Sequence, residues 1–305
     1  MPQTGPVVRC HPEVRRAGSA IMDRSLMGIA EDEPMVGRVV EWARGRDDIR
    51  VVLRTGSRGR GDGMVDALSD HDIELYTTDV ERYSGDDGWV RELGEVWVNV
   101  ELEGPYDNPA HLVFFEGGVK VDFQVVPVQR LGEMVEDGLD ELHERGYQVL
   151  FDRDGSAAGL PAATGSAPVG ELPDQAEFGA LCSEFWFEIA HLPRYSARGE
   201  FWVVKARDWE TKELLLTMIE WHAISRHGSG HDVWHAGTKM RQWAARGVWE
   251  RVEGVFAIRD PLRQAQATAD LFGELAREVA TAGGLDYPEK AEKAIRPYLD
   301  QLPSL

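Results

Sequence analysis

One arrangement constrains this chain more than any other: an apolar run, a Gly-Ser pair, a glycine-rich spacer, and an Asp-His-Asp triplet that leads into a second apolar run. The first apolar run, residues 49–53, is typical of a buried strand, and the turn-type pair Gly56-Ser57 ends it. Backbone N–H groups and a hydroxyl at this turn suit the phosphates of a nucleotide. The alternative is a hairpin with exposed acids, which is common in acidic chains.

The triplet supplies two carboxylates, Asp70 and Asp72, just before a second strand expected over residues 73–77. Carboxylates two residues apart on a strand point to the same face and repel each other unless a cation lies between them. Mg²⁺ is usually held by one or two carboxylates together with substrate phosphates. The sequence therefore predicts a Mg²⁺ site here, and a third carboxylate on a neighbouring strand would complete it.

Asp122 is the candidate for that third carboxylate. It lies in the middle of an expected strand, residues 119–126, after the hairpin signal Gly117-Gly118. The period-two pattern of a strand places it on one face with Lys120 and Gln124, opposite the apolar residues. It can then project toward Asp70 and Asp72 instead of being buried in the core.

A further strand is expected over residues 96–103, which alternate in polarity. The pattern predicts an apolar, half-buried face of Val96, Val98, Val100 and Leu102, with Glu101 on the opposite, polar face. A helix is expected over residues 131–142.

The apolar period changes from two to 3.6 in the second half of the chain, which predicts a helical bundle. Helices are expected over residues 178–192, 201–222, 239–245, 262–279 and 288–299. The expected domains are an extended N-terminal segment (1–30), an α+β domain (31–155), a linker rich in Ala, Gly, Ser and Pro (156–173) and the helical domain (174–305). Several tryptophans, including Trp186, could form a stacking wall in the helical domain, although helix core is the plainer interpretation.

The charge balance narrows the class of partner. With 53 acidic and 33 basic residues, the formal net charge is −20, which disfavours nucleic acid and anionic membranes and favours cationic small molecules. The acidity could also serve solubility alone. Two isolated cysteines fit a reducing cytoplasm, and no apolar run approaches the roughly 20 residues of a membrane span.

Taken together, several short blocks resemble the aminoglycoside 6-adenylyltransferases, often called streptomycin adenylyltransferases. The blocks are residues 54–58, 68–75, 120–123, 184–186, 218–222, 237–239, 271–272 and 276–280. The resemblance covers residues 35–298. It implies a polymerase-β-like nucleotidyltransferase domain with a mixed sheet, followed by a helical domain.

The resemblance also implies Mg²⁺-dependent transfer of AMP from ATP to a hydroxyl of an aminoglycoside, with release of pyrophosphate. The resemblance implies that Gly56 and Ser57 bind the nucleotide phosphates and that Asp70 and Asp72 bind Mg²⁺. Asp122 completes the metal set or accepts the proton of the acceptor.

Further candidates follow from this chemistry. Arg58, Lys205 and Lys239 are candidates for binding the phosphates. Glu101, and after it Glu184, are the alternative proton acceptors. The candidates for binding the cationic acceptor are Glu184, Trp186, Glu188 and Glu220. For each lysine, a solvated helix residue is the alternative.

Other functions stay open at this point. A nucleotidyltransferase of the same fold could act on a lincosamide, another metabolite or a protein hydroxyl. A protein that binds a cationic ligand without catalysis is a second possibility, and an acidic interaction module is a third. The sequence does not distinguish a monomer from a homodimer.

Overall fold

The computed structural model describes residues 33–301 except residues 62, 64, 67, 105, 106, 234 and 235. The chain divides into two compact units between Ser166 and Ala167, inside the stretch 156–173 that the sequence marks as a linker. The expected N-terminal segment, residues 1–30, lies outside the described residues.

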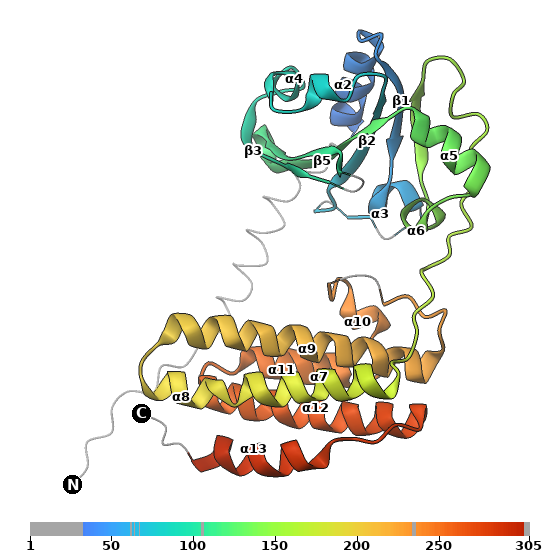
Figure 1. Cartoon of the computed structure of the whole chain (residues 1–305). Helices are drawn as coiled ribbons and strands as arrows, with labels where there is room; N and C mark the ends of the chain where they lie inside the picture. Colours follow the sequence, from blue (N-terminus) through green and yellow to red (C-terminus); the bar gives the residue numbers. More distant parts are fainter. Residues whose placement is uncertain are drawn as a thin grey trace, which may run out of the picture. The chain divides into compact units, whose positions relative to one another are not determined.

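The first unit is built on a six-stranded mixed sheet with the order β3-β4-β5-β2-β1-β6 (Figure 1). The strands are β1 (Ile49–Arg54), β2 (His71–Thr77), β3 (Val96–Glu103), β4 (Pro109–Phe115), β5 (Val119–Pro127) and β6 (Gln148–Asp152). Neighbours pair antiparallel except β2 and β5, which pair in parallel. The α+β class with a mixed sheet is thus confirmed.

Short helices cover the two faces of this sheet. On one face, α2 (Glu33–Arg44) packs with the segment that holds the 3-10 helix Glu81–Tyr83 and α4 (Gly88–Arg91). On the other face, α5 (Gln129–Asp137) packs against β1, β2 and β5. A second 3-10 helix, Glu116–Gly118, joins β4 to β5, and α3 (Gly56–Arg60) follows β1.

The helix expected over residues 131–142 is wrong in one respect, because two helices occupy this region. α5 ends at Asp137, and α6 covers Glu141–Glu144. Gly138 stands between them with a φ of 96°, a conformation that side-chain-bearing residues rarely adopt and that ends the helix.

Strand β3 is the edge of the sheet, and the buried apolar face expected for it is also wrong. Val98, Val100 and Leu102 are exposed by 52%, 48% and 40%. The reason is a bulge: Val96 pairs with Phe115, but Val98 pairs with Phe114. Since Phe115 and Phe114 point to opposite faces, the bulge turns the rest of the strand over.

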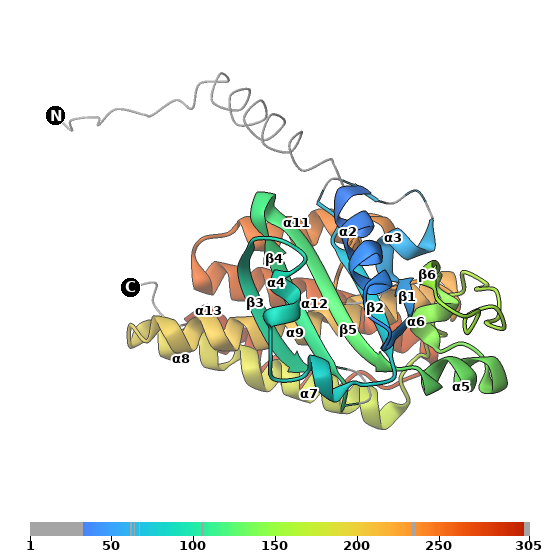
Figure 2. The same cartoon turned by 90° about the horizontal axis from the view of Figure 1, so that it is seen from above.

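The second unit is helical. Its helices are α7 (Gln175–Ile189), α8 (His191–Ala197), α9 (Phe201–His227), α10 (Met240–Trp243), α11 (Val248–Ala257), α12 (Pro261–Gly283) and α13 (Glu289–Gln301). The sequence predicts five of these and misses α8 and α11. The long helix α9 packs against α7, α8 and α12, side by side with them in both views (Figure 2).

Local sequence signals explain where two of these helices begin. Asp174 caps α7 in a capping box with Glu177, and Asp260 accepts hydrogen bonds from Leu262 N and Arg263 N, with Pro261 at the start of α12. Their apolar stripes form one core that contains Phe185, stacked on Phe272. Over the described part of the chain, no helix combines the length and apolar character that a membrane crossing needs.

Candidate active site

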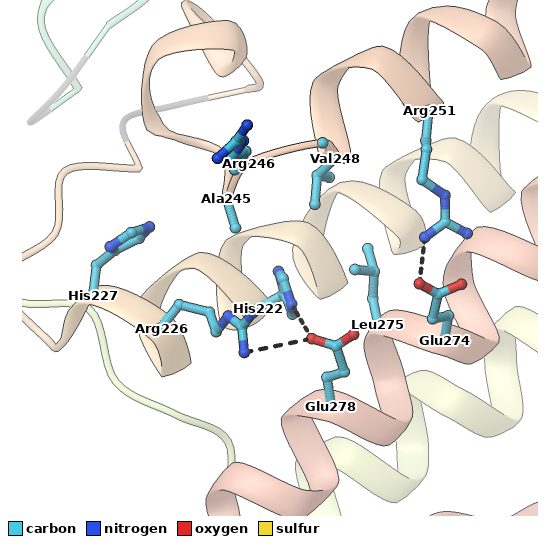
Figure 3. Close-up of a pocket in the computed structure, with 11 residues that line it drawn as sticks. His222, Arg226, His227, Ala245, Arg246, Val248, Arg251, Glu274, Leu275 and Glu278 are labelled. Atoms are coloured by element: carbon cyan, nitrogen blue, oxygen red, sulfur yellow. Dashed lines mark hydrogen bonds and ion pairs between the residues drawn. The ribbon is translucent and has the colours of Figure 1, made fainter.

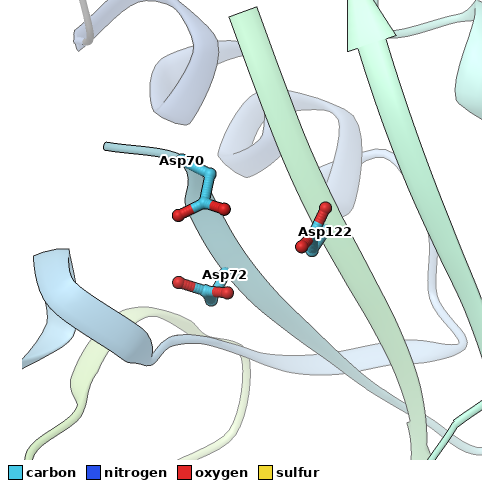
Figure 4. Close-up of side chains that lie close together, drawn as sticks. All are labelled: Asp70, Asp72 and Asp122. Carbon is cyan, nitrogen blue, oxygen red and sulfur yellow. The ribbon is translucent and has the colours of Figure 1, made fainter. Parts of the chain in front are cut away.

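The parallel pair β2 and β5 brings two carboxylates together. Asp72 on β2 stands directly opposite Asp122 on β5, and paired residues project from the same face of a sheet. Asp70, which immediately precedes β2, joins them, and each of the three carboxylates offers an oxygen within 4.8 Å of the others. Figure 4 shows the three side chains gathered where these two strands lie side by side.

A lysine lies among these carboxylates. The Nζ atom of Lys120 donates to Asp70 Oδ2 at 2.7 Å and to Asp122 Oδ2 at 2.8 Å. The sequence pattern places Lys120 on the same face as Asp122, but it assigns the lysine no function. The sequence signal for this contact is that Lys120 and Asp122 are two residues apart on one strand, which puts both side chains over the same patch of the sheet.

The electrostatics of the cluster favour a cation. Burial, followed by the charges of Asp70 and Asp122, raises the pKa of Asp72 to about 6. Asp122 Oδ1 is buried and has no hydrogen-bond partner among the described residues. A concentrated set of carboxylate oxygens with an unused buried acceptor fits a hard divalent cation such as Mg²⁺.

Gly56 and Ser57 lie beside the cluster. Thr55 N, at the end of β1, donates to Asp72 O at 2.9 Å, so the two chain segments are held together there. The Gly-Ser pair starts the short helix α3 instead of forming the expected turn. Gly56 has a φ of 62°, and a Cβ atom at this position would lie 1.8 Å from Asp72 Oδ2. Only glycine allows this approach of the backbone to the carboxylate.

Arg58 does not face the nucleotide position that the sequence predicts for it. Its guanidinium is buried and donates to the carbonyls of Ser69 at 2.8 Å and Asp70 at 3.0 Å. These bonds fix the loop that carries Asp70. The prediction of a phosphate contact is corrected, because Nε and Nη2 of this side chain already donate to backbone carbonyls.

Glu101, the second candidate for the proton acceptor, also needs correction. It pairs with His111, which pairs with Phe123, and Phe123 lies in the core on the face opposite Asp122. The Glu101 carboxylate accepts from Gly85 N at 2.7 Å. The bulge in β3 is the cause, since it exchanges the two faces beyond Val96.

The second unit holds the candidates for acceptor binding, and two of them are internal. Trp186 is 1% exposed, and its Nε1 donates to Tyr287 Oη at 3.1 Å. Glu188 is 8% exposed and pairs with Arg207 Nη1 at 2.7 Å. The expectation that these two side chains contact a substrate is corrected, because the core and an ion pair occupy them.

The remaining candidates of this unit are accessible. Glu184 on α7 is exposed, as are Lys205 on α9 and Lys239, which precedes α10 with a φ of 55°. Glu220 on α9 is half-buried, and burial raises its pKa to about 7. Within the described part of the chain, no hydrogen bond or ion pair holds the Glu220 carboxylate.

A cavity of about 420 Å³ in the second unit is lined by other residues. Charged and polar side chains dominate its wall (Figure 3): His222, Arg226, His227, Arg246, Arg251, Glu274 and Glu278. Its acids are already paired, Glu274 with Arg251 at 2.7 Å and Glu278 with His222 at 2.9 Å. Its lining includes none of the described residues that the sequence nominates for a site.

Comparisons with known proteins bear on the whole chain. A family model described as streptomycin adenylyltransferase matches residues 29–302. An aminoglycoside 6-adenylyltransferase of Campylobacter jejuni is 27% identical over 269 residues, which cover 84% of this chain and 90% of that protein. The aminoglycoside 6-adenylyltransferase of Bacillus subtilis (strain 168) is 22% identical over 277 residues, which cover 86% and 94%.

Among solved structures, an aminoglycoside 6-adenyltransferase from Bacillus subtilis aligns with a TM-score of 0.42 and 19% identity. The alignment covers 88% of this chain and 97% of that one.

Proposed function

Because this chain belongs to the streptomycin adenylyltransferase family, we propose that it transfers the AMP group of ATP to a hydroxyl of an aminoglycoside and releases pyrophosphate. Membership of the family makes the chain a nucleotidyltransferase. The acceptor, the nucleotide and the metal ion are parts of the proposal.

The observation that carries the proposal is the position of Asp72 opposite Asp122 across parallel strands, with Asp70 on the same patch. Three half-buried carboxylates that gather on one patch of a sheet give a strong negative field. Asp70, Asp72 and Asp122 would hold Mg²⁺, which supplies charge stabilisation at the α-phosphate and at the leaving pyrophosphate. Nucleotidyl transfer depends mostly on such positioning and electrostatics.

The protein itself positions the reacting groups. Gly56 lets the backbone lie against Asp72, so α3, which Gly56 and Ser57 begin, starts beside this carboxylate. We assign the N–H groups at the start of α3 and the Ser57 hydroxyl to the phosphates. Arg58 fixes the loop of Asp70 through the Ser69 and Asp70 carbonyls, and this keeps the carboxylate in place.

Proton transfer from the acceptor hydroxyl needs a carboxylate on the same face as the cluster. Asp122 meets this condition, and its Oδ1 has no hydrogen-bond partner among the described residues. Glu101 points to the opposite face. We therefore assign to Asp122 the role of accepting the proton of the acceptor hydroxyl.

Recognition of a cationic acceptor needs accessible carboxylates. Glu220 is the stronger candidate of the helical unit, because it is half-buried without a described partner and an ammonium or guanidinium group would relieve its desolvation. Glu184 is exposed and is the second candidate. Lys205 and Lys239 remain candidates for the phosphates.

A panel of acceptors tests the proposal. The protein is incubated with ATP and Mg²⁺, and pyrophosphate release is followed with aminoglycosides, including streptomycin, and with lincosamides. Release with an aminoglycoside alone supports the proposal. Turnover with a lincosamide and none with any aminoglycoside overturns the acceptor assignment, and drug binding that neither needs ATP nor gives product favours a binding protein without catalysis.

A further inference from the structure

Lys120 bridges two of the three carboxylates of the cluster. Its ammonium contacts Asp70 Oδ2 at 2.7 Å and Asp122 Oδ2 at 2.8 Å, and the lysine side chain is 33% exposed. A lysine ammonium is charged at neutral pH, so the side chain that contacts both carboxylates balances part of the negative charge of the cluster.

The same two carboxylates cannot serve two cations at full strength. A Mg²⁺ ion held by Asp70 and Asp122 would place a divalent charge beside the ammonium that contacts both of them. Even with solvent nearby, neighbouring positive charges repel each other. Metal binding and the two lysine contacts therefore oppose each other.

The nucleotide offers the displaced ammonium a new partner. Of the cations expected at the phosphates, Arg58 is committed to the carbonyls of Ser69 and Asp70, and Lys205 and Lys239 belong to the second unit. Lys120 stands on the same patch as the carboxylates, and lysine has a flexible stem with three donors that suits a phosphate. A short movement of this side chain keeps its charge inside the site.

We propose that Lys120 stands in for the cation in the metal-free enzyme and moves to the phosphates of the nucleoside triphosphate when the metal–nucleotide complex binds. The inference rests on the proposed function, since it takes the cluster as the metal site. It makes Lys120 a counter-ion that weakens binding of metal alone and strengthens binding of metal with nucleotide. The site thereby favours the loaded complex over free metal.

Mn²⁺ binding, followed by electron paramagnetic resonance without nucleotide, tests the first half. Lys120→Met and Lys120→Gln remove the competing charge, so each variant is expected to bind Mn²⁺ about tenfold more tightly than the wild type. Lys293→Met is the matched control: Lys293 on α13, in the second unit, pairs with Glu289. This control is expected to bind Mn²⁺ as the wild type does.

The KM for ATP in pyrophosphate release tests the second half, and it is expected to rise about tenfold in both Lys120 variants and to stay unchanged in Lys293→Met. Equal or weaker Mn²⁺ binding in folded Lys120 variants, or an unchanged KM, overturns the inference. Failure of the proposed function gives a different result. The wild-type protein would then bind Mn²⁺ no better than Asp72→Asn does, and it would transfer no AMP.

Discussion

Asp72 and Asp122 face each other in register across the pair of parallel strands β2 and β5. The relationship follows from the strand order, because β5 reaches β2 only after the antiparallel β3–β4–β5 meander has been formed. Residues that are 50 positions apart thus share one patch of the sheet. A metal site built on two central strands is held more rigidly than one built on loops.

Gly56 is expected to be indispensable for the site. Gly56→Ala would place a methyl group against Asp72 Oδ2, and AMP transfer should fall by about 100-fold or more, because the carboxylate must move. Gly61→Ala is the matched control. Its φ of 64° equals that of Gly56 to within two degrees, but a Cβ there meets nothing within 4 Å.

Both alanines carry the backbone strain of a positive φ, about 1 kcal/mol, so unfolding in urea should show similar strain in the two variants. Gly61→Ala should keep most of its activity. Equal activity losses in the two variants would show that the strain matters and that the contact with Asp72 does not.

Glu220 is expected to make acceptor binding depend on pH. Burial raises the pKa of Glu220 to about 7, so the carboxylate becomes charged, and able to attract a cation, as the pH rises through about 7. The KM for an aminoglycoside should fall over this range, and Glu220→Gln should remove the dependence and raise the KM at pH 8 by about tenfold.

Stability should change in the opposite direction. A carboxyl whose pKa is higher in the folded protein than in the unfolded chain loses stabilisation as pH rises from about 4.5 to about 7. Glu220→Gln should therefore be more stable than the wild type at neutral pH. Glu213→Gln, an exposed position on the same helix, is the control. A pH profile of KM that is the same in all three proteins would contradict the assignment of Glu220.

A buried network on the same face of the sheet as the three carboxylates is expected to set part of the pH dependence of stability. His143 contacts Glu74 Oε2 at 2.9 Å and Asp140 Oδ1 at 2.7 Å. Burial opposes the charge of this imidazole, but Asp140 and Glu74 outweigh burial and raise the pKa of His143 to about 9. The stabilisation is complete below the ordinary histidine pKa of about 6.5 and is lost as pH rises through about 9.

Replacement of His143 by Ala should cost about 3 kcal/mol near pH 6.5, because it leaves a buried carboxylate without its partner. The cost should shrink by about 2 kcal/mol near pH 9.5, measured by urea unfolding. His227→Ala, at an exposed position, serves as the control. A cost that is constant over this pH range would mean that the imidazole is neutral throughout.

Trp186 is expected to act on stability and not on substrate binding. Trp186→Phe removes part of a fully buried side chain and its hydrogen bond to Tyr287, and it should cost about 2 kcal/mol of unfolding free energy. Trp202→Phe, at a position that is 89% exposed, should change stability by less than about 0.5 kcal/mol. A raised acceptor KM in a fully stable Trp186→Phe protein would restore the substrate contact that the sequence predicts.

The sequence predicts the three carboxylates because their signal is local and periodic. Asp70 and Asp72 precede and enter one strand, and Asp122 lies on the polar face of another. The pairing of these two strands is not local, but an acid in an apolar strand already needs a polar partner on its own face. Alternation alone therefore finds these three carboxylates without the topology.

The same rule fails for Glu101 because it assumes an unbroken strand. One additional residue between Val96 and Val98 exchanges the two faces of β3. No residue type in this stretch indicates a bulge. The prediction for Arg58 fails for another reason. The partners of its guanidinium are the carbonyls of Ser69 and Asp70, eleven and twelve residues further along the chain. Which way an arginine turns depends on that tertiary contact and not on its neighbours in sequence.

Mass spectrometry of streptomycin incubated with ATP, Mg²⁺ and either the wild-type protein or Asp72→Asn tests AMP transfer and the carboxylate site together. We expect streptomycin with one added AMP for the wild type, and unmodified streptomycin for Asp72→Asn, with circular dichroism and urea unfolding showing that this variant is folded. AMP transfer by folded Asp72→Asn at near wild-type rates would contradict the carboxylate site, and wild-type protein that leaves streptomycin unmodified would contradict the acceptor.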